Sequence, residues 1–278
     1  MIKKTYNICK VIGIPIKLDI SVIILAIYLV VTLGDPIIGI FAAVGLLLSI
    51  ALHELGHSVV AMAFGCKVRD ITLMLLGGCA TMVTMPRKPW QEFLMALAGP
   101  AVSLLLALIG LQIIPLIPGL PRLVVDVFMI FGYINLVLGV FNLAPAFPMD
   151  GGRILRSFLQ HFFMTKLKAT WVASRVGRFL AIVFGLWTLY SMFTGDSGGY
   201  LFIRLLLAFY IYRAAEREYR IVQMEERGGA PDNPFAEMFR NFSFGGKATQ
   251  PPEDDGQVVI SPPPYKHKGS SRADIHKE

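Results

Sequence analysis

The chain has 278 residues, of which 55% are hydrophobic and 16% charged, and its mean hydropathy of +0.61 is far above that of an ordinary soluble domain. This composition excludes a soluble globular protein and indicates a membrane protein. The net charge of +7 is accompanied by no Gly-rich phosphate loop and no aromatic-basic stripe. We therefore expect no nucleic-acid partner.

Apolar stretches that approach the length a helix needs to cross a bilayer, about 20 residues, recur six times along the chain. We therefore expect an all-α membrane protein built as a six-helix transmembrane bundle. Lysines precede the first stretch as they precede a signal peptide, but no small-x-small cleavage site follows it, so we interpret it as a retained helix. The six stretches cover residues 18–33, 37–64, 91–114, 122–144, 176–194 and 199–215.

The positions of the basic residues predict the orientation, because Lys and Arg that flank the spans are retained on the cytoplasmic side. Six spans place both termini on one side, and all basic residues except Arg122 and Arg204 then lie there or at its edge. We expect a multi-pass protein of the cell membrane (plasma or inner membrane) with both termini cytoplasmic. Cys9, Cys66 and Cys79 then lie where thiols stay reduced, and no disulfide framework is expected.

Two segments depart from the helical pattern. Residues 226–278 are rich in Pro, Gly and charge, which predicts a disordered cytoplasmic tail after a membrane domain of residues 1–225. Residues 68–89 mix β-branched and apolar residues around Gly77 and Gly78, a pattern typical of a β-hairpin. Because this segment is so apolar, we place the hairpin in the membrane between helices 2 and 3, where its backbone requires a protein cover or a watery cavity.

The second span contains the stretch LSIALHELGHSVVAMAFG, residues 48–65. His53 and His57 are four residues apart and therefore share one helix face. In the pattern His-Glu-x-x-His, two histidines hold zinc and the glutamate acts on a water molecule. The alternative is that these polar residues face the cytoplasm at the end of a span. Within an apolar run they carry a desolvation cost unless they are paired, bind metal or face water, so we favour a metal site with Glu54 as the catalytic residue.

A zinc site with two histidines needs a third protein ligand and an open position. Asp150, in NLAPAFPMDGG at the end of the fourth span, is the candidate. Pro145 and Pro148 break the helix before it, and the two glycines after it free the backbone. The alternative is that Asp150 caps the amphipathic helix that follows. The topology favours a ligand, because the second and fourth spans both run inward and bring the two motifs to the same depth.

Together these features resemble the site-2 protease family of intramembrane zinc metalloproteases. The resemblance is carried by HELGH within a span, the apolar Gly-Gly hairpin, ALAGPAVSLLLA at 96–107 and NLAPAFPMDGG, and it covers about residues 18 to 215. It implies one zinc ion per chain, held by His53, His57 and Asp150, with Glu54 as general base and acid.

The resemblance also implies where a substrate binds. Asn142 is expected near the substrate backbone, and the hairpin around Gly77 and Gly78 is expected to pair with the substrate. One departure from the family pattern is Ser103, where many relatives have Asn. We interpret this difference as leaving the zinc site untouched but as putting in doubt any contact that the family makes through this position. A second departure is that no PDZ or CBS domain is attached, so the chain resembles the prokaryotic type without them.

The expected activity is hydrolysis of peptide bonds in or near transmembrane segments, as in regulated intramembrane proteolysis. The expected partners are a transmembrane protein substrate and the lipid bilayer, and a homo-oligomer remains open. Two alternatives come from other classes of protein. A metal-ion transporter needs a polar path to the far side, yet the outward halves of spans two to four are almost wholly apolar, with Asp126 alone near the outer edge. A non-catalytic scaffold that binds substrate helices has no need of Glu54 between the ligands.

Overall fold

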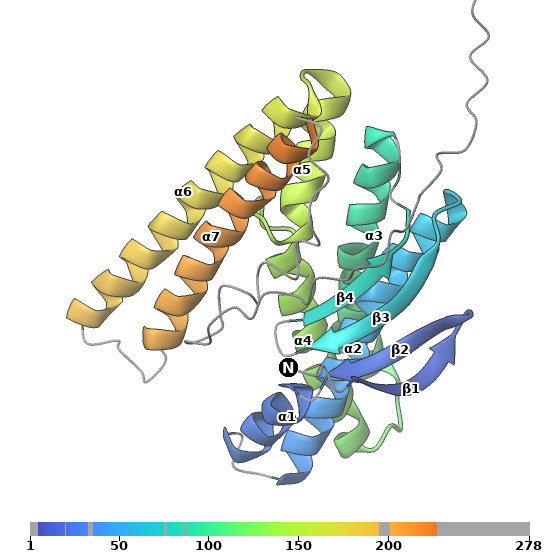
Figure 1. Cartoon of the computed structure of the whole chain (residues 1–278). Helices are drawn as coiled ribbons and strands as arrows, with labels where there is room; N and C mark the ends of the chain where they lie inside the picture. Colours follow the sequence, from blue (N-terminus) through green and yellow to red (C-terminus); the bar gives the residue numbers. More distant parts are fainter. Residues whose placement is uncertain are drawn as a thin grey trace, which may run out of the picture. The chain divides into compact units, whose positions relative to one another are not determined.

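A computed structural model describes residues 5–19, 21–32, 36–74, 77–84, 86, 88–194 and 201–226, which form a helical bundle with a small sheet (Figure 1). The strands are β1 (Thr5–Val11), β2 (Ile14–Asp19), β3 (Val68–Met74) and β4 (Gly77–Met82). The helices are α1 (Ser21–Thr32), α2 (Pro36–Ala63), α3 (Pro89–Leu108), which continues through η1 (Ile109–Ile113) and η2 (Ile114–Leu116), α4 (Arg122–Asn142), α5 (Asp150–Phe162), α6 (Lys166–Phe193) and α7 (Leu201–Glu226).

The described residues include four helices that are long and apolar enough to cross a membrane, namely α2, α3 with its continuation, α4 and α6. The expected count of six is not confirmed. Helix α1 has only 12 residues, well short of the roughly 20 that a span needs. Helix α7 has 26 residues, but its second half is charged and Arg204 interrupts its apolar first half. The tail at 227–278 lies outside the described residues, so the division into two domains stays a prediction.

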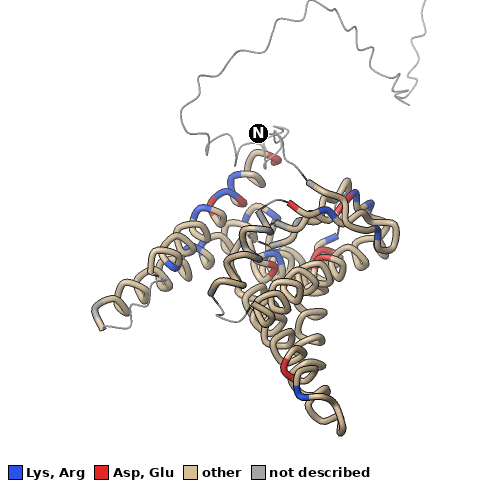
Figure 2. Tube along the Cα trace, turned by 90° about the horizontal axis from the view of Figure 1, so that it is seen from below, with Lys and Arg blue, Asp and Glu red and all other residues tan. Residues whose placement is uncertain are grey.

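The surface of the helices fits an apolar environment. Long stretches of the tube carry no charged residue (Figure 2). Large apolar side chains are exposed along the same helices, among them Val137 on α4 and Phe179 and Leu186 on α6. A soluble monomer rarely exposes a continuous apolar surface of this extent. The hydrocarbon of a bilayer accounts for it.

The sheet is larger than the expected hairpin and corrects the all-α assignment. The predicted hairpin is present as β3 and β4, in which Leu73 pairs with Gly78 and Met74 with Gly77, and residues 75–76 lie outside the described residues. Strands β1 and β2 add to it in the order β1-β2-β3-β4, with β2 parallel to β3 and the other two pairs antiparallel. The depth of the hairpin in the membrane stays a prediction.

No strand is predicted from the sequence in residues 5–19, where the lysines dominate the pattern. The two strands there are joined by Ile12 and Gly13, which have φ angles of 52° and 81°. Two successive positive φ values are typical of the tight turn that connects antiparallel strands. The first of these positions holds a β-branched residue, which rarely adopts such a φ, so the turn carries no Asn-Gly or Asp-Gly signal in the sequence.

The sheet is fixed to α2 by an apolar cluster close to the HELGH stretch. Ile16 of β2 and Ile71 and Leu73 of β3 are buried together with Ile50 of α2. Ile50 lies about one helical turn before His53, so this packing places the sheet beside the polar part of α2.

Asp70 ties three strands of the sheet together. It is 3% exposed, and its Oδ2 accepts hydrogen bonds from Lys17 Nζ of β2 (2.9 Å) and from Arg69 Nε (3.0 Å). Its Oδ1 accepts a hydrogen bond from Thr81 Oγ1 of β4 (3.0 Å). Burial raises the pKa of Asp70, but the hydrogen bonds from Lys17, Thr81 and Arg69 lower it by more, so the pKa lies below its ordinary value.

We expect Asp70→Asn to lower the free energy of unfolding at neutral pH by about 1–3 kcal/mol, because hydrogen bonds between charged groups are lost. The folded-state pKa of Asp70 is below the unfolded value of about 3.9. The advantage of the wild type is therefore fully present above that pH and is lost as the pH falls through the folded-state pKa. Thermal unfolding of both proteins in detergent micelles between about pH 3 and pH 7 measures it, and a difference independent of pH would contradict the expectation.

Candidate metal centre

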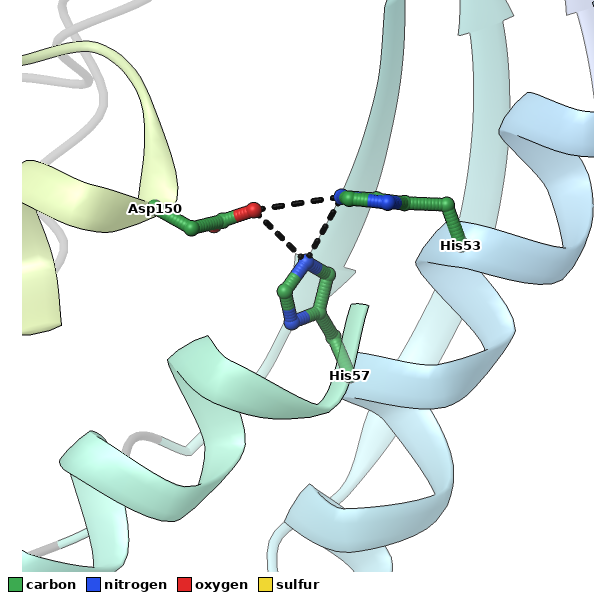
Figure 3. Close-up of side chains that lie close together, drawn as sticks. All are labelled: His53, His57 and Asp150. Atoms are coloured by element: carbon green, nitrogen blue, oxygen red, sulfur yellow. Dashed lines mark hydrogen bonds and ion pairs between the residues drawn. The ribbon is translucent and has the colours of Figure 1, made fainter. Parts of the chain in front are cut away.

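The two histidines of HELGH and the aspartate of MDGG meet at one point. His53 and His57 lie on the same face of α2 and are 4% and 7% exposed. Both imidazoles point toward the carboxylate of Asp150, which comes from the first residue of α5 (Figure 3). The two Nε2 atoms are 3.2 Å apart, and each is 3.1 Å from Asp150 Oδ2.

The end of α4 and the start of α5 explain how Asp150 reaches the histidines. The prolines after Asn142 end α4, and α5 begins at Asp150. A Cβ on Gly151 would collide with the carbonyl oxygens of Leu143 and Ala144, so the first turn of α5 packs directly on the preceding loop. Met149 is the N-cap residue of α5, and no side chain caps the helix. The alternative in which the Asp150 carboxylate serves as a helix cap is therefore wrong.

The contacts of the other ring nitrogens indicate which tautomer each neutral imidazole adopts. His57 Nδ1 donates a hydrogen bond to the carbonyl oxygen of Met95 (2.7 Å), so its Nε2 carries a lone pair. His53 Nδ1 lies 2.9 Å from Ser103 Oγ, and with that hydroxyl as acceptor its Nε2 also carries a lone pair. Asp150, whose carboxyl group has an ordinary pKa of about 3.9, supplies a carboxylate oxygen as the third donor.

Three electron-pair donors therefore face one another in a buried place. Such an arrangement is repulsive unless a proton or a metal cation lies among them. The donor atoms of His53, His57 and Asp150 lie within 4.8 Å of one another, close enough to bind one metal ion. Two imidazole nitrogens and one carboxylate oxygen form a common ligand set of catalytic zinc, which leaves a further position open. The residues present fit a zinc ion.

Helix α3 forms the wall behind the donor atoms. Met95, Gly99 and Ser103 are spaced four residues apart, and all three are buried. A Cβ on Gly99 would lie 2.7 Å from His53 Nε2 and closer still to His57 Nε2, so only glycine leaves the donor atoms free. The signal in the sequence was the run of small residues in ALAGPAVS, from which no role was predicted for Met95 or Gly99.

Ser103, where the sequence departs from the family pattern, contacts one of the three proposed ligands. Its hydroxyl contacts His53 Nδ1 and fixes the orientation of that imidazole. Ser49, one turn before His53, forms hydrogen bonds with the backbone of α2 and with α4. Its Oγ donates to the carbonyl of Gly45 (2.7 Å) and accepts a hydrogen bond from the fully buried Asn135 of α4 (2.8 Å). This pair joins α2 to α4.

Glu54 connects the site to the hairpin. It is half-buried on α2 next to His53. A Cβ on Gly78 would lie 2.9 Å from Glu54 Oε1 and closer still to its Cγ, so strand β4 passes directly over this side chain. Gly77 begins β4 and pairs with Met74. The structure thus brings Gly78 to Glu54, and the role of Gly77 stays a prediction.

Asn142 is the last residue of α4 and is half-buried. Its Nδ2 donates a hydrogen bond to the carbonyl oxygen of Leu138 in the same helix (2.9 Å). The predicted contact between Asn142 and a substrate backbone stays a prediction.

Comparisons with known proteins agree with this geometry. Residues 41–122 and 120–184 match the family model described as "Peptidase family M50". A zinc metalloprotease of Methanocaldococcus jannaschii is 39% identical over 225 residues, which are 78% of this chain and 61% of that protein. A protein of Synechocystis sp. is 38% identical over 198 residues, which are 70% of this chain and 51% of the relative. The chain thus spans between half and two thirds of the length of these curated relatives.

A solved structure is also similar. The site-2 protease from Methanocaldococcus jannaschii matches with a TM-score of 0.55 and 35% sequence identity, and the match covers 77% of this chain and 95% of that one.

We expect Gly99→Ala to abolish tight zinc binding, because the added methyl group occupies the space beside both Nε2 atoms. The zinc Kd should rise by about 10- to 100-fold. Metal analysis of the purified protein and competition with a chelator measure this change. Gly45→Ala in α2 is the matched control, because its Cβ would make only ordinary contacts of 3.6 Å and 3.7 Å with Phe131 and Ile134. Equal zinc affinities in the two variants would place the metal elsewhere.

Proposed function

The chain belongs to peptidase family M50, and from this premise we propose that it is an intramembrane zinc metalloprotease of the site-2 type. Its proposed substrates are membrane proteins, in which it hydrolyses peptide bonds within or beside transmembrane segments. The observation that carries the proposal is the convergence of three donor atoms from α2 and α5, with Glu54 beside them, in a protein whose helices are apolar enough to lie in a membrane.

Each residue of the site has a distinct proposed role. His53, His57 and Asp150 hold one zinc ion per chain, and when bound this ion supplies a Lewis acid that lowers the pKa of a water molecule and polarises a carbonyl group. Glu54 accepts the proton of the attacking water and later donates it to the leaving amine. Ser103 keeps the His53 ring in the orientation that the site requires.

The sheet supports a proposal for substrate binding. A transmembrane helix hides its carbonyl groups in its own hydrogen bonds, so it must unwind locally before attack. Strand β4 is last in the sheet order, and its Gly78 lies against Glu54. An unwound segment that adds to β4 would thus lie beside the general base, held by main-chain hydrogen bonds that demand little of its sequence. Gly77 continues this strand, and Asn142 donates to the substrate backbone. Substrates should contain helix-weakening residues near the cut.

The proposal includes a location. The protein lies in the cell membrane, crosses it several times and has both termini in the cytoplasm, because nearly all its basic residues are then on that side. The catalytic centre lies near the cytoplasmic end of α2. Residues 226–278 form a cytoplasmic tail, and a homo-oligomer is compatible with the site, which needs donors from one chain.

We expect Glu54→Gln to reduce cleavage of a coexpressed membrane substrate by about 100- to 10,000-fold while zinc content stays at the wild-type level, because general-base catalysis is lost and the ligands remain. His53→Ala is the comparison variant and should lose both zinc and cleavage. Immunoblots of candidate substrates together with metal analysis give the two readouts. Equal cleavage by Glu54→Gln and the wild type would end the mechanism, and zinc binding without any cleavable substrate would favour a transporter or a scaffold.

We expect Gly78→Ala to retain zinc but to lower cleavage by about 10- to 100-fold, because the new methyl group displaces the Glu54 carboxylate or the strand beside it. The same coexpression assay and metal analysis apply, again with Gly45→Ala as control. If Gly78→Ala cleaves at the wild-type rate, strand β4 does not position Glu54.

A further inference from the structure

A buried arginine joins three helices next to the metal centre. Arg156 of α5 is 6% exposed. Its Nη1 donates a hydrogen bond to Glu218 Oε1 of α7 (2.7 Å), and its Nη2 donates to Glu92 Oε1 of α3. The three residues, called here the Arg156 triad, thus link α5 to helices on both sides of it.

The Arg156 triad pairs one buried positive charge with two carboxylates. A buried guanidinium is costly unless it is paired and hydrogen-bonded. Burial lowers the pKa of Arg156, but the charges of Glu92 and Glu218 raise it by more, so the cation is permanent. Because a guanidinium is planar and carries several donors, it can bind two carboxylates from different helices at once, which the single ammonium of Lys does less well.

On the α5 side, the triad is coupled to the metal ligand Asp150. Arg156 lies six residues after Asp150 in the same helix. Its guanidinium carbon lies 5.4 Å from the centroid of the Phe147 ring. Phe147 is buried and stands three residues before Asp150. Arg156 therefore follows the ligand in the chain and contacts a residue that precedes it.

On the α3 side, the triad is coupled to the histidines. Glu92 lies in the first turn of α3. One turn later, the Met95 carbonyl accepts the hydrogen bond from His57 Nδ1, and after another turn Gly99 lies against the His57 ring. The ion pair between Arg156 and Glu92 thus joins the helix that orients His57 to the helix that carries Asp150.

We propose that Arg156 is a positioning residue for the metal centre, which holds α5 against α3 so that Asp150 reaches the two histidines. This inference rests on the zinc site proposed above. Both Nη atoms of Arg156 bind carboxylates, and Arg156 acts through the placement of Asp150. The ion pair sets the distance between ligands that come from distant parts of the chain.

The test compares Arg156→Met and Arg156→Lys with the wild type by zinc Kd and by the visible absorption spectrum of the Co²⁺-substituted protein, which reports the geometry of the ligands. We expect Arg156→Met to raise the zinc Kd by about 10- to 100-fold and to change the Co²⁺ spectrum. Arg156→Lys keeps the charge but not both bonds, so an intermediate Kd is expected.

The matched control is Lys166→Met, which removes an ion pair with Glu225 between α6 and α7 that is far more exposed than the Arg156 triad. It should leave the zinc Kd and the Co²⁺ spectrum unchanged. A merely structural role for Arg156 would lower the unfolding temperature without changing either metal readout, and that result would overturn the proposal.

Arg156→Met leaves two carboxylates beside a cavity of about 180 Å³ that Arg156, Glu92 and Glu218 line, so water can reach them. If this variant nevertheless fails to fold, Glu92→Gln and Glu218→Gln test the positioning role of Arg156 instead, because each keeps Arg156 and one carboxylate. Glu92→Gln should weaken zinc binding more than Glu218→Gln, since only Glu92 lies on the helix that contacts His57. An unchanged zinc Kd in Glu92→Gln would overturn the proposal.

Zinc binding by the wild type separates a failure of the proposed zinc site from a failure of the proposed role of Arg156. Zinc binding by the wild type that is lost in His53→Ala supports the site itself. Absence of zinc binding in the wild type overturns both the site and the role of Arg156, whereas equal binding by the wild type and a folded Arg156→Met overturns the role of Arg156 alone.

Discussion

The structure depends on the convergence of three electron-pair donors in a place largely closed to water. Two imidazole Nε2 atoms and a carboxylate oxygen lie 3.1–3.2 Å from one another, and the outer ring nitrogens are held by Met95 and Ser103. Without a proton or a metal cation between them, repulsion and lost hydration would push such donors apart. The packing of α3 behind them, the broken end of α4 and the start of α5 all serve to keep them together.

The three proposed zinc ligands could be predicted, two of them from one short stretch of chain and the third from the order of the spans. The spacing of His53 and His57 defines their common face through helix geometry alone, and the position of Asp150 follows from the direction in which successive spans run. The wall formed by Met95, Gly99 and Ser103 could not be predicted, because its function depends on which face of a neighbouring helix turns toward α2. Gly99 matters because it has no side chain, and nothing in the sequence distinguishes a glycine with this role from other glycines.

The fold could likewise be predicted only in part from the sequence. The apolar runs of α2, α3, α4 and α6 are long enough to be recognised by length and composition. The turn between β1 and β2 at Ile12 and Gly13 has neither Asn-Gly nor Asp-Gly, and β2 pairs on its other side with β3, which lies much later in the chain. The ends of α1 and α7 depart from the expected spans because a hydropathy average overlooks where an apolar run stops and a charged one begins.

The donors of the site come from positions 93 and 97 residues apart along the chain. An ion held between them therefore closes a long loop and acts as a reversible cross-link between the first and second halves of the bundle. A ligand that binds only the folded state stabilises it by mass action, by about 2.7 kcal/mol at a free concentration 100 times its Kd. The supply of metal to the cell would then govern the lifetime of the protein as well as its chemistry.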